Sequence, residues 1–345
     1  MVASETETSK AFNRARDGRK RMSASTVAKQ IGARVARATP ALASKVRMRS
    51  TTSSGSGVKA ALSGSDVYET DIATNEYLQF HYATDADLCP FVDEKSGDVE
   101  PQYAQALGHL MNFPVVCADV LASAAGRTGS KSGRALDVGC SVGRTSFELT
   151  RHFDQVVGLD FSHAFVDTAN RMKSEGSIEY SRIVSGDVTE TKTAAVPNIP
   201  VEDRERVSFV QGNACALDLD ALGGPFDGIV AANLLCRLPE PLDFLKSMET
   251  AINPGGTLVL ISPYSWLEEY TEREKWIGWN YDGADAAKDA AGGVPQLDSF
   301  AEVKEVLEAA GFSLTKKTNI PFVMREHRRK YQLGISECTA WRKAE

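Results

Sequence analysis

The stretch Arg134-Ala135-Leu136-Asp137-Val138-Gly139-Cys140-Ser141-Val142-Gly143-Arg144 decides the fold. A short, mostly apolar run stops at a glycine and a helical pattern follows over residues 144–153, which is typical of a strand, a turn and a helix. The same unit then repeats. Residues 155–159 form a strand pattern that ends at Asp160, and Ser162 is placed to cap a helix through about residue 173. Strands that alternate with helices predict a mostly parallel sheet.

Five more strand patterns complete the expected sheet. Two further helices connect them, one over 241–252 and one opened by a capping box of Ser299 and Glu302 and ended by Gly311. Residues 253–256 read as a turn. The strand patterns lie at residues 207–211, 226–231, 257–261, 312–318 and 335–341. We therefore expect an α/β fold of the Rossmann-like class, with a seven-stranded, mostly parallel sheet and helices on both faces.

Charge divides the chain into two unlike parts. The 345 residues include 39 Lys+Arg and 46 Asp+Glu, of which residues 1–65 hold 13 and 3. This first part, rich in Ser, Thr and Ala, is typical of a disordered basic tail or a transit peptide, and a start at Met22 would give an acid-free leader. The expected parts are this tail at 1–65, an N-terminal helical lid and substrate segment at 66–133, and a core at 134–345 with insertions at 179–205 and 263–297.

Composition argues against several classes of protein. With 42% hydrophobic and 25% charged residues the chain can bury a core, and no apolar run approaches the roughly 18 residues of a membrane span. Six cysteines without a CxxC pair indicate mostly reduced, buried thiols and no metal. The single aromatic residue of the tail, Phe12, argues against nucleic-acid binding. We expect a protein of the cytoplasm, or of an organelle if the tail is a transit peptide.

Polar residues at the strand ends predict the ligand site, because open α/β sheets bind ligands at that edge. Gly139 and Gly143 have GxxxG spacing, whereas a dinucleotide fold needs GxGxxG to bring amides onto a pyrophosphate. An acid before such a turn, Asp137, suits a ligand with a cationic amino group and no phosphate, and S-adenosylmethionine is such a ligand. Asp160 can accept hydrogen bonds from ribose hydroxyls.

The third and fourth strand ends would complete this site. Asn213 can accept from the adenine amino group, the Ala214 amide can donate to a ring nitrogen, and Asn233 would lie beneath the sulfonium. Gly186-Asp187 is a competing adenine reader, but one short connection to the next strand favours Asn213. The expected cofactor residues are Asp137, Gly139, Cys140, Gly143, Arg144, Asp160, Phe161, Asn213, Ala214 and Asn233.

A more particular pattern lies in five blocks of sequence: Asn75-Glu76-Tyr77-Leu78-Gln79-Phe80-His81-Tyr82, residues 135–144, Ala231-Ala232-Asn233-Leu234-Leu235-Cys236-Arg237-Leu238-Pro239, Pro263-Tyr264-Ser265-Trp266-Leu267-Glu268-Glu269 and Pro321-Phe322-Val323-Met324-Arg325-Glu326-His327. These blocks resemble the 4-mercaptohistidine (5-thiohistidine) N1-methyltransferase module, a class I S-adenosylmethionine-dependent methyltransferase that forms the carboxyl-terminal domain of ovothiol synthases. The resemblance covers about residues 66–342. It departs from the family at Asn213, where Asp is expected, and in having no iron-dependent sulfoxide synthase domain within these residues.

The resemblance implies transfer of the sulfonium methyl to an imidazole nitrogen of 5-thiohistidine, the final step of ovothiol biosynthesis. Alignment of the reacting atoms supplies most of such catalysis, and a carboxylate, His or water would take the ring proton. An amino-acid acceptor offers a carboxylate that Arg can hold and an ammonium that Glu can hold. The implied acceptor residues are Tyr77, His81, Tyr82, Arg237, Tyr264, Glu268, Glu269, Arg325 and His327. A separate sulfoxide synthase would supply the thiohistidine.

Three other activities stay open. A methyltransferase for another small metabolite would share every cofactor residue. A catalytically silent partner of a sulfoxide synthase would bind the cofactor without turnover. A nicotinamide dehydrogenase is least favoured, because the third fingerprint glycine is absent from the turn.

Overall fold

The computed structural model describes residues 66–84, 87, 112–127, 131–196, 198–279 and 297–345. The expected basic tail, the middle of the expected lid and the end of the insertion at 263–297 lie outside these residues. In the described part of the chain, no helix is both long enough and apolar enough to cross a bilayer.

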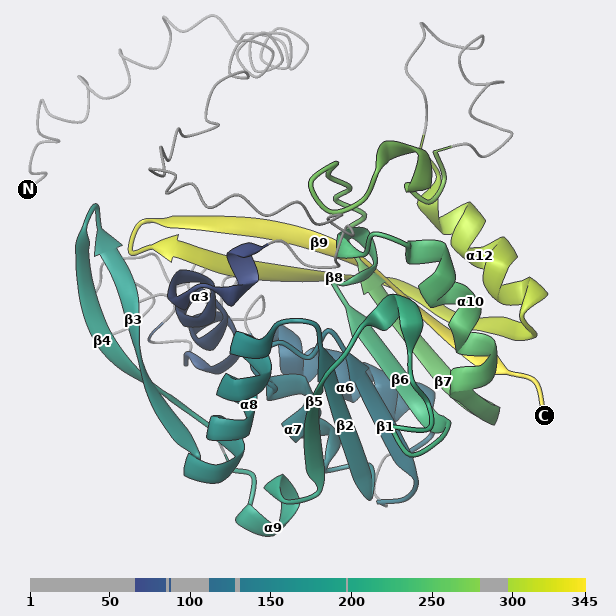
Figure 1. Ribbon diagram of the computed structural model, residues 1–345, viewed down its shortest axis with the longest axis horizontal. Coiled ribbons are helices and arrows are strands. Elements are labelled where there is room, and N and C mark those ends of the chain that lie inside the picture. The colour runs from purple at the N-terminus through teal and green to yellow at the C-terminus, as the bar shows by residue number, and fades with distance from the viewer. Residues whose placement is uncertain (1–65, 85–86, 88–111, 128–130, 197, 280–296) are drawn as a thin grey trace, which may run out of the picture. The chain divides into compact units, whose positions relative to one another are not determined.

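A seven-stranded sheet with the order β5-β2-β1-β6-β7-β9-β8 forms the centre of the molecule (Figure 1). The first five strands of this order run parallel, and β9 pairs antiparallel with both β7 and β8. The expected mostly parallel sheet is therefore confirmed. The strands are β1 (Arg134–Val138), β2 (Gln155–Asp160), β5 (Val207–Gln211), β6 (Phe226–Ala232), β7 (Ile252–Ser262), β8 (Phe312–His327) and β9 (Lys330–Lys343).

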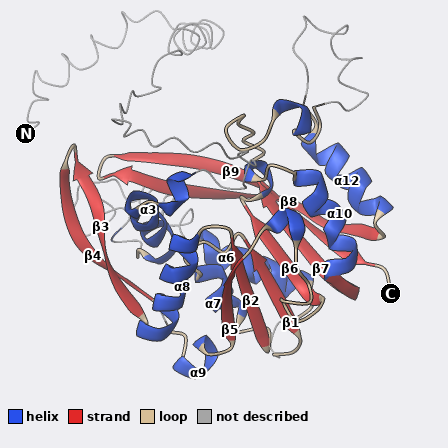
Figure 2. Cartoon of the chain, viewed as in Figure 1, coloured by secondary structure: helices blue, strands red, loops and turns tan. Residues whose placement is uncertain are grey.

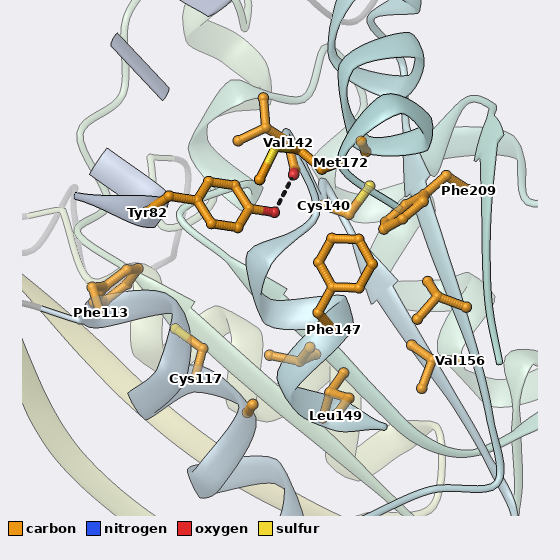
Figure 3. Packing of buried hydrophobic residues seen from close by; sticks show 14 of the residues in the cluster. Tyr82, Phe113, Cys117, Cys140, Val142, Phe147, Leu149, Val156, Met172 and Phe209 are labelled. Atoms are coloured by element: carbon orange, nitrogen blue, oxygen red, sulfur yellow. Dashed lines mark hydrogen bonds between the residues drawn. The ribbon is translucent and has the colours of Figure 1, made fainter. Parts of the chain in front are cut away.

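Helices cover both faces of the sheet (Figure 2), because successive side chains of a central strand point to opposite sides. Ala135 joins a core with Phe147 on one face, and the next residue, Leu136, joins a core with Phe244 on the other. Figure 3 shows the first of these cores. The helices of the first face are α6 (Phe113–Ala124), α7 (Arg144–Leu149) and α8 (His163–Glu175), and those of the second are α10 (Pro241–Ala251) and α12 (Ser299–Ala309).

Shorter elements surround this sheet. The segment predicted as an N-terminal lid, called the lid below, contains the 3-10 turn η1 (Asp66–Glu69) and helix α3 (Asp71–Tyr82). The remaining ones are α9 (Val201–Arg204), η2 (Ala214–Ala216), η3 (Leu235–Arg237) and η4 (Arg273–Lys275).

The two closing strands are longer than expected. Strands β8 and β9 pair from Phe312 with Lys343 to His327 with Lys330, so residues 319–334 belong to a long hairpin. Because proline donates no ladder hydrogen bond, Pro321 argued against a strand at this position and the prediction ended the strand too early. Strand β8 is the edge of the sheet, where proline is tolerated.

Three local expectations are also wrong. Helix α7 ends at Leu149 rather than at Phe153. Residues 253–256 form a bulge inside β7 rather than a turn before it. Asp298, not Ser299, caps α12, with its carboxylate accepting from the Ala301 amide at 3.0 Å. The Ser299 hydroxyl instead accepts from the Trp266 indole, so a tertiary contact outcompetes the local cap.

A separate two-stranded sheet lies between α8 and β5 in the chain. Its strands are β3 (Ser177–Ser185) and β4 (Val188–Ala195), and Gly186-Asp187 forms the turn that joins them. Because this pair does not end a strand of the main sheet, its interpretation as an adenine reader is wrong. Asn213 follows β5, which pairs with β2 in the main sheet.

The expectation of reduced, buried thiols is confirmed for the described cysteines. Cys117, Cys140, Cys236 and Cys338 are free and buried, and Cys215 is free and partly buried. Cys89 lies outside the described residues.

Candidate active site

A cavity of about 480 Å³ lies at the carboxyl ends of β1, β2, β5 and β6. Parallel strands end at the same edge, so residues that are far apart in sequence meet there. Predicted residues that line this cavity are Tyr77, His81, Asp137, Gly139, Cys140, Asp160, Phe161, Ala214, Asn233 and Arg237.

Two glycines bring the backbone after β1 close to the cavity. Gly139 has φ of 76° and Gly143 has φ of 89°, values that glycine adopts without a steric penalty. A Cβ atom at Gly143 would lie 2.6 Å from the ring of Phe209, which fills the space behind the turn. Gly143 therefore supports the turn from its buried side rather than lining the cavity.

Asp137 lies at the end of β1 with only 2% of its surface exposed. Its carboxylate accepts a hydrogen bond of 2.6 Å from the Ser146 hydroxyl on α7. Burial raises the pKa of Asp137 to about 7, since desolvation disfavours the charged form. A cationic ligand group beside Asp137 would favour the ionised carboxylate again.

Asp160 ends β2 and holds the turn of the neighbouring strand. Its two carboxylate oxygens accept from the backbone amides of Ser141, at 2.8 Å, and Ser162, at 2.9 Å. Burial raises its pKa to about 6 although these amides favour the ionised form. Each oxygen has a second lone pair, so the carboxylate can accept from ligand hydroxyls as well.

Asn213 and Asn233 follow the ends of β5 and β6, and their side-chain amides make hydrogen bonds within the fold. The Asn213 side chain accepts from the Cys215 amide at 2.9 Å and caps η2, leaving Ala214 to line the cavity. Asn233 has φ of 54° and lines the cavity, while its side-chain oxygen accepts from the Ser336 hydroxyl at 2.7 Å. The expected adenine contact through Asn213 thus depends on a side chain that already has a local partner.

The N-terminal lid is attached to α8 at the edge of the cavity. The Glu69 carboxylate accepts from the His163 and Ala164 amides, at 3.0 and 3.1 Å, and so caps that helix. The Ser162 hydroxyl donates to the Tyr68 carbonyl at 3.0 Å. The lid therefore lies directly beside Asp160 and its turn.

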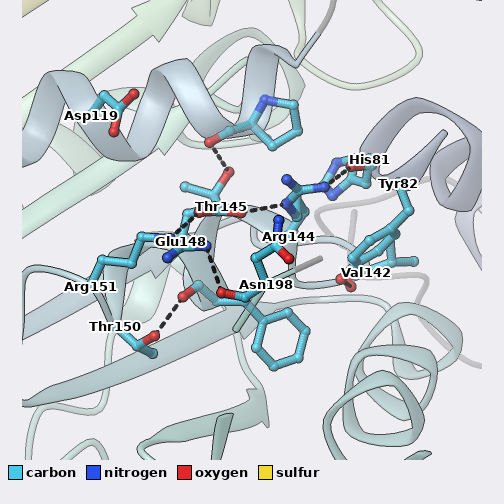
Figure 4. Close-up of polar contacts among 12 residues, drawn as sticks. His81, Tyr82, Asp119, Val142, Arg144, Thr145, Glu148, Thr150, Arg151 and Asn198 are labelled. Atoms are coloured by element: carbon cyan, nitrogen blue, oxygen red, sulfur yellow. Dashed lines mark hydrogen bonds and ion pairs between the residues drawn. The ribbon is translucent and has the colours of Figure 1, made fainter. Parts of the chain in front are cut away.

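Figure 4 shows how the last turn of α3 is joined to the glycine turn. Arg144 donates to the His81 carbonyl at 3.2 Å and pairs with Glu148 at 2.9 Å. The Tyr82 hydroxyl donates to the Val142 carbonyl at 2.7 Å. Arg144 and Tyr82 thus hold the lid onto the glycine turn and do not line the cavity.

His81 lines the cavity as a neutral imidazole. Burial, with a further contribution from the Arg144 guanidinium, lowers its pKa to about 3. Its Nδ1 atom is sealed from solvent and has no hydrogen-bond partner among the described residues. A buried polar atom without a partner is costly, and such atoms concentrate at functional sites.

Arg237 lines the cavity at the end of η3 and is held in place by uncharged groups. It donates to the Ser265 carbonyl at 2.6 Å and to the Cys236 carbonyl at 3.0 Å, and it stacks 4.7 Å above the Tyr270 ring. The Tyr270 ring in turn stacks on Tyr68, with ring centroids 6.1 Å apart. Arg237 is therefore a fixed cation whose described partners are neutral.

Besides Tyr82, five implied acceptor residues lie away from the cavity lining. Glu268 is exposed, and the Tyr264 hydroxyl donates to the Glu337 carboxylate at 3.3 Å. The His327 ring accepts from a backbone amide near the hairpin end. Arg325 is buried and donates to the Asp87 carbonyl at 3.3 Å. Side chains alternate along β8, so Met324 points to the cavity and Arg325 points to the other face of the strand. Glu269, like Glu268, is exposed.

Several lining residues were not among the predicted site residues. Tyr68 and Tyr270 lie far apart in the sequence, and their stacking is decided by the tertiary structure. Phe322, Met324 and Gln332 reach the cavity only because the β8–β9 hairpin is long.

Comparisons with known proteins agree with this geometry. Residues 110–317 match a family model described as a methyltransferase domain. The chain is 26% identical to the uncharacterized protein YmfD of Escherichia coli (strain K12) over 198 residues, 55% of this chain and 76% of that protein. It is 26% identical over 168 residues to a phosphatidylethanolamine N-methyltransferase of Cereibacter sphaeroides, 46% of this chain and 69% of the relative.

Two solved structures are among those that align with this chain. The magnesium protoporphyrin IX methyltransferase of Synechocystis PCC 6803 with bound SAH aligns with a TM-score of 0.41 at 15% identity, covering 72% of this chain and 89% of that one. The N-methyltransferase NodS of Bradyrhizobium japonicum WM9 in complex with S-adenosyl-L-homocysteine aligns with a TM-score of 0.39 at 14% identity, covering 79% and 99%.

Proposed function

We propose that this chain, which belongs to the methyltransferase domain family, uses 5-thiohistidine as its acceptor. The proposed reaction transfers a methyl group to an imidazole nitrogen of that amino acid. The protein is an S-adenosylmethionine-dependent methyltransferase, and S-adenosylmethionine is its methyl donor. The thiohistidine acceptor, and with it the final step of ovothiol biosynthesis, is the part that we propose.

The donor fits the carboxylates that the cavity presents. Asp137 would hold the donor's ammonium, and Asp160 would accept from its ribose hydroxyls. Gly139 lets the turn between β1 and α7 pass close to Leu234, since a Cβ at this position would lie 3.0 Å from that side chain. The bound donor supplies an activated methyl group on a sulfonium.

Arg237 is the residue best placed to hold the acceptor. Its described partners are neutral, so it can still pair with the carboxylate of an amino acid. It is also preorganised by two carbonyls and an aromatic ring, which reduces the entropy lost on binding. Arg325, the other candidate, faces away from this cavity.

The observation that carries the proposal is that all five resembling blocks contribute to one cavity lining. Representative residues of these blocks are His81, Asp137, Arg237, Ser265 and Met324. Segments as far apart as residues 81 and 324 thus meet around the donor carboxylates. A resemblance spread over five blocks and gathered at one site supports a shared acceptor.

Mass spectrometry tests the acceptor directly. The full chain is incubated with S-adenosylmethionine and either 5-thiohistidine or histidine, with a separately prepared sulfoxide synthase product as a second thiohistidine source. We expect a 14 Da gain on thiohistidine that is reduced with Asp160→Ala when S-adenosylmethionine is limiting. A gain only on a different small metabolite would contradict the acceptor, and donor binding without any gain would indicate a silent partner of the synthase.

A further inference from the structure

We propose that His81 reads the sulfur of the acceptor by donating a hydrogen bond from Nε2 to the thiolate, which makes it the residue that distinguishes thiohistidine from histidine. This inference rests on the proposed function and deepens it. It concerns one contact between the lid and the substrate.

The first step is placement. The His81 ring lines the cavity from the last turn of α3, and its carbonyl accepts from Arg144 while the adjacent Tyr82 hydroxyl donates to Val142. Both anchors belong to the glycine turn that receives the donor. The ring is therefore held at a fixed position relative to the donor, and Figure 4 shows this junction.

The second step is the choice of nitrogen. Nδ1 is sealed from solvent, so Nε2 is the ring nitrogen left for the cavity. A neutral imidazole has one N–H and one lone pair. A proton on Nδ1 would be a buried donor without a described partner, beside the cationic Arg144, and buried orphan N–H groups are rare. Nδ1 therefore keeps the lone pair and Nε2 carries the proton.

The third step is the charge of the acceptor. A thiolate is an anion, and a hydrogen bond to an ionised group is roughly twice as strong as one between neutral groups. With Arg237 at the carboxylate and the His81 N–H at the sulfur, the cavity presents two donors to an acceptor that has two anionic groups. Histidine has only the carboxylate and leaves the His81 donor unpaired.

The chemistry then balances without a base. An unprotonated ring nitrogen of the thiolate form attacks the methyl carbon, the new N–C bond forms, and the C–S bond of the sulfonium breaks. The electron pair goes to sulfur, which gives S-adenosylhomocysteine. The product ring is an imidazolium beside a thiolate, so no proton has to leave. A histidine whose pKa is depressed to about 3 would in any case be a weak base.

The test compares His81→Phe, His81→Gln and His81→Asn in the full chain. Titration calorimetry measures the binding of thiohistidine and of histidine to the complex with S-adenosylhomocysteine, and steady-state kinetics measures turnover. We expect His81→Phe to weaken thiohistidine binding about 10- to 150-fold and histidine binding by less than about threefold. Gln places an amide N–H near the Nε2 position and should keep most of the affinity, whereas the shorter Asn should not.

A matched control and two other outcomes separate the possibilities. His152→Phe makes the same exchange at a histidine near Asp119, away from the cavity lining, and should change neither affinity. Equal weakening of thiohistidine and histidine by His81→Phe would overturn the inference while the proposed function stands. Wild-type protein that gives no 14 Da gain on thiohistidine would overturn both. If His81→Phe does not melt cooperatively, the contrast between Gln and Asn decides.

Discussion

Two carboxylates at strand ends, the buried Asp137 and the half-buried Asp160, determine how the donor site responds to its ligand. Burying a carboxylate in a cavity is costly, and the raised pKa of each residue reflects that cost. A donor that brings an ammonium, a sulfonium and two hydroxyls offsets it. The two carboxylates therefore lower the stability of the protein without donor and raise its affinity for the donor.

Asp160→Ala should weaken S-adenosylmethionine binding by about 1–3 kcal/mol, the usual value for lost hydrogen bonds to a charged group. Calorimetry on the purified variant measures this change. Asp187→Ala is the matched control, because Asp187 is the acid of the rejected adenine reader at the β3–β4 turn. Unchanged affinity in Asp160→Ala would remove Asp160 from the donor site.

Donor affinity should rise with pH between about 5.5 and 7.5. The pKa of Asp137 is raised to about 7 and that of Asp160 to about 6, so in this window the empty site must release protons before it can hold a cationic ligand. Calorimetry over this range, with Asp137→Asn for comparison, measures the effect. A pH-independent affinity in the wild type would contradict ionised carboxylates as the donor ligands.

The same raised pKa values also determine how the stability of the ligand-free protein changes with pH. Both pKa values lie above the usual value of an aspartate, about 3.9, so the folded state binds more protons than the unfolded chain between about pH 4 and 7. The contribution of these groups to stability is present at low pH and is lost as the pH rises through this window. Bound donor should reverse this trend.

At the scale of an element, the glycine turn depends on what packs behind it. Gly143 and Gly311 both have positive φ, 89° and 83°, but only Gly143 has a ring against the position of a Cβ. Backbone conformation and packing can therefore be separated by the same substitution at two sites.

Gly143→Ala should lower the free energy of unfolding by about 2–5 kcal/mol, of which about 1–2 comes from the positive φ and the rest from contact with Phe209. Gly311→Ala is the control and should lose only the conformational part, since nothing lies within 4 Å of its Cβ position. Urea denaturation of both variants measures the difference. Equal losses would mean that Phe209 gives way without cost.

At the scale of the whole molecule, residues 134–343 supply every strand of the main sheet, and the lid from residue 66 completes the cavity. Deleting residues 1–65 should therefore leave a cooperative melt, donor affinity and methylation unchanged. Thermal melting and the mass assay on the truncated chain check this. Loss of the cooperative melt would show that the fold needs part of the first 65 residues.

The sequence by itself determined the sheet and the donor side of the site. The apolar run before Gly139 and the acid at Asp160 follow local rules, because a strand buried on both faces must be apolar and a carboxylate at its end meets the ligand edge. Such patterns need no knowledge of distant segments. They predicted four of the five parallel strands to within one residue and placed Asp137 and Asp160 in one cavity.

Only the tertiary structure decided the acceptor side. Tyr82 is in the same block as His81, and Arg325 is in the same block as Met324. His81 and Met324 line the cavity, whereas Tyr82 and Arg325 make structural contacts elsewhere. The direction of a side chain depends on helix phase and strand alternation relative to a distant surface, which spacing along the chain does not fix. The stacking of Tyr68 on Tyr270 is likewise a long-range contact that no local pattern specifies.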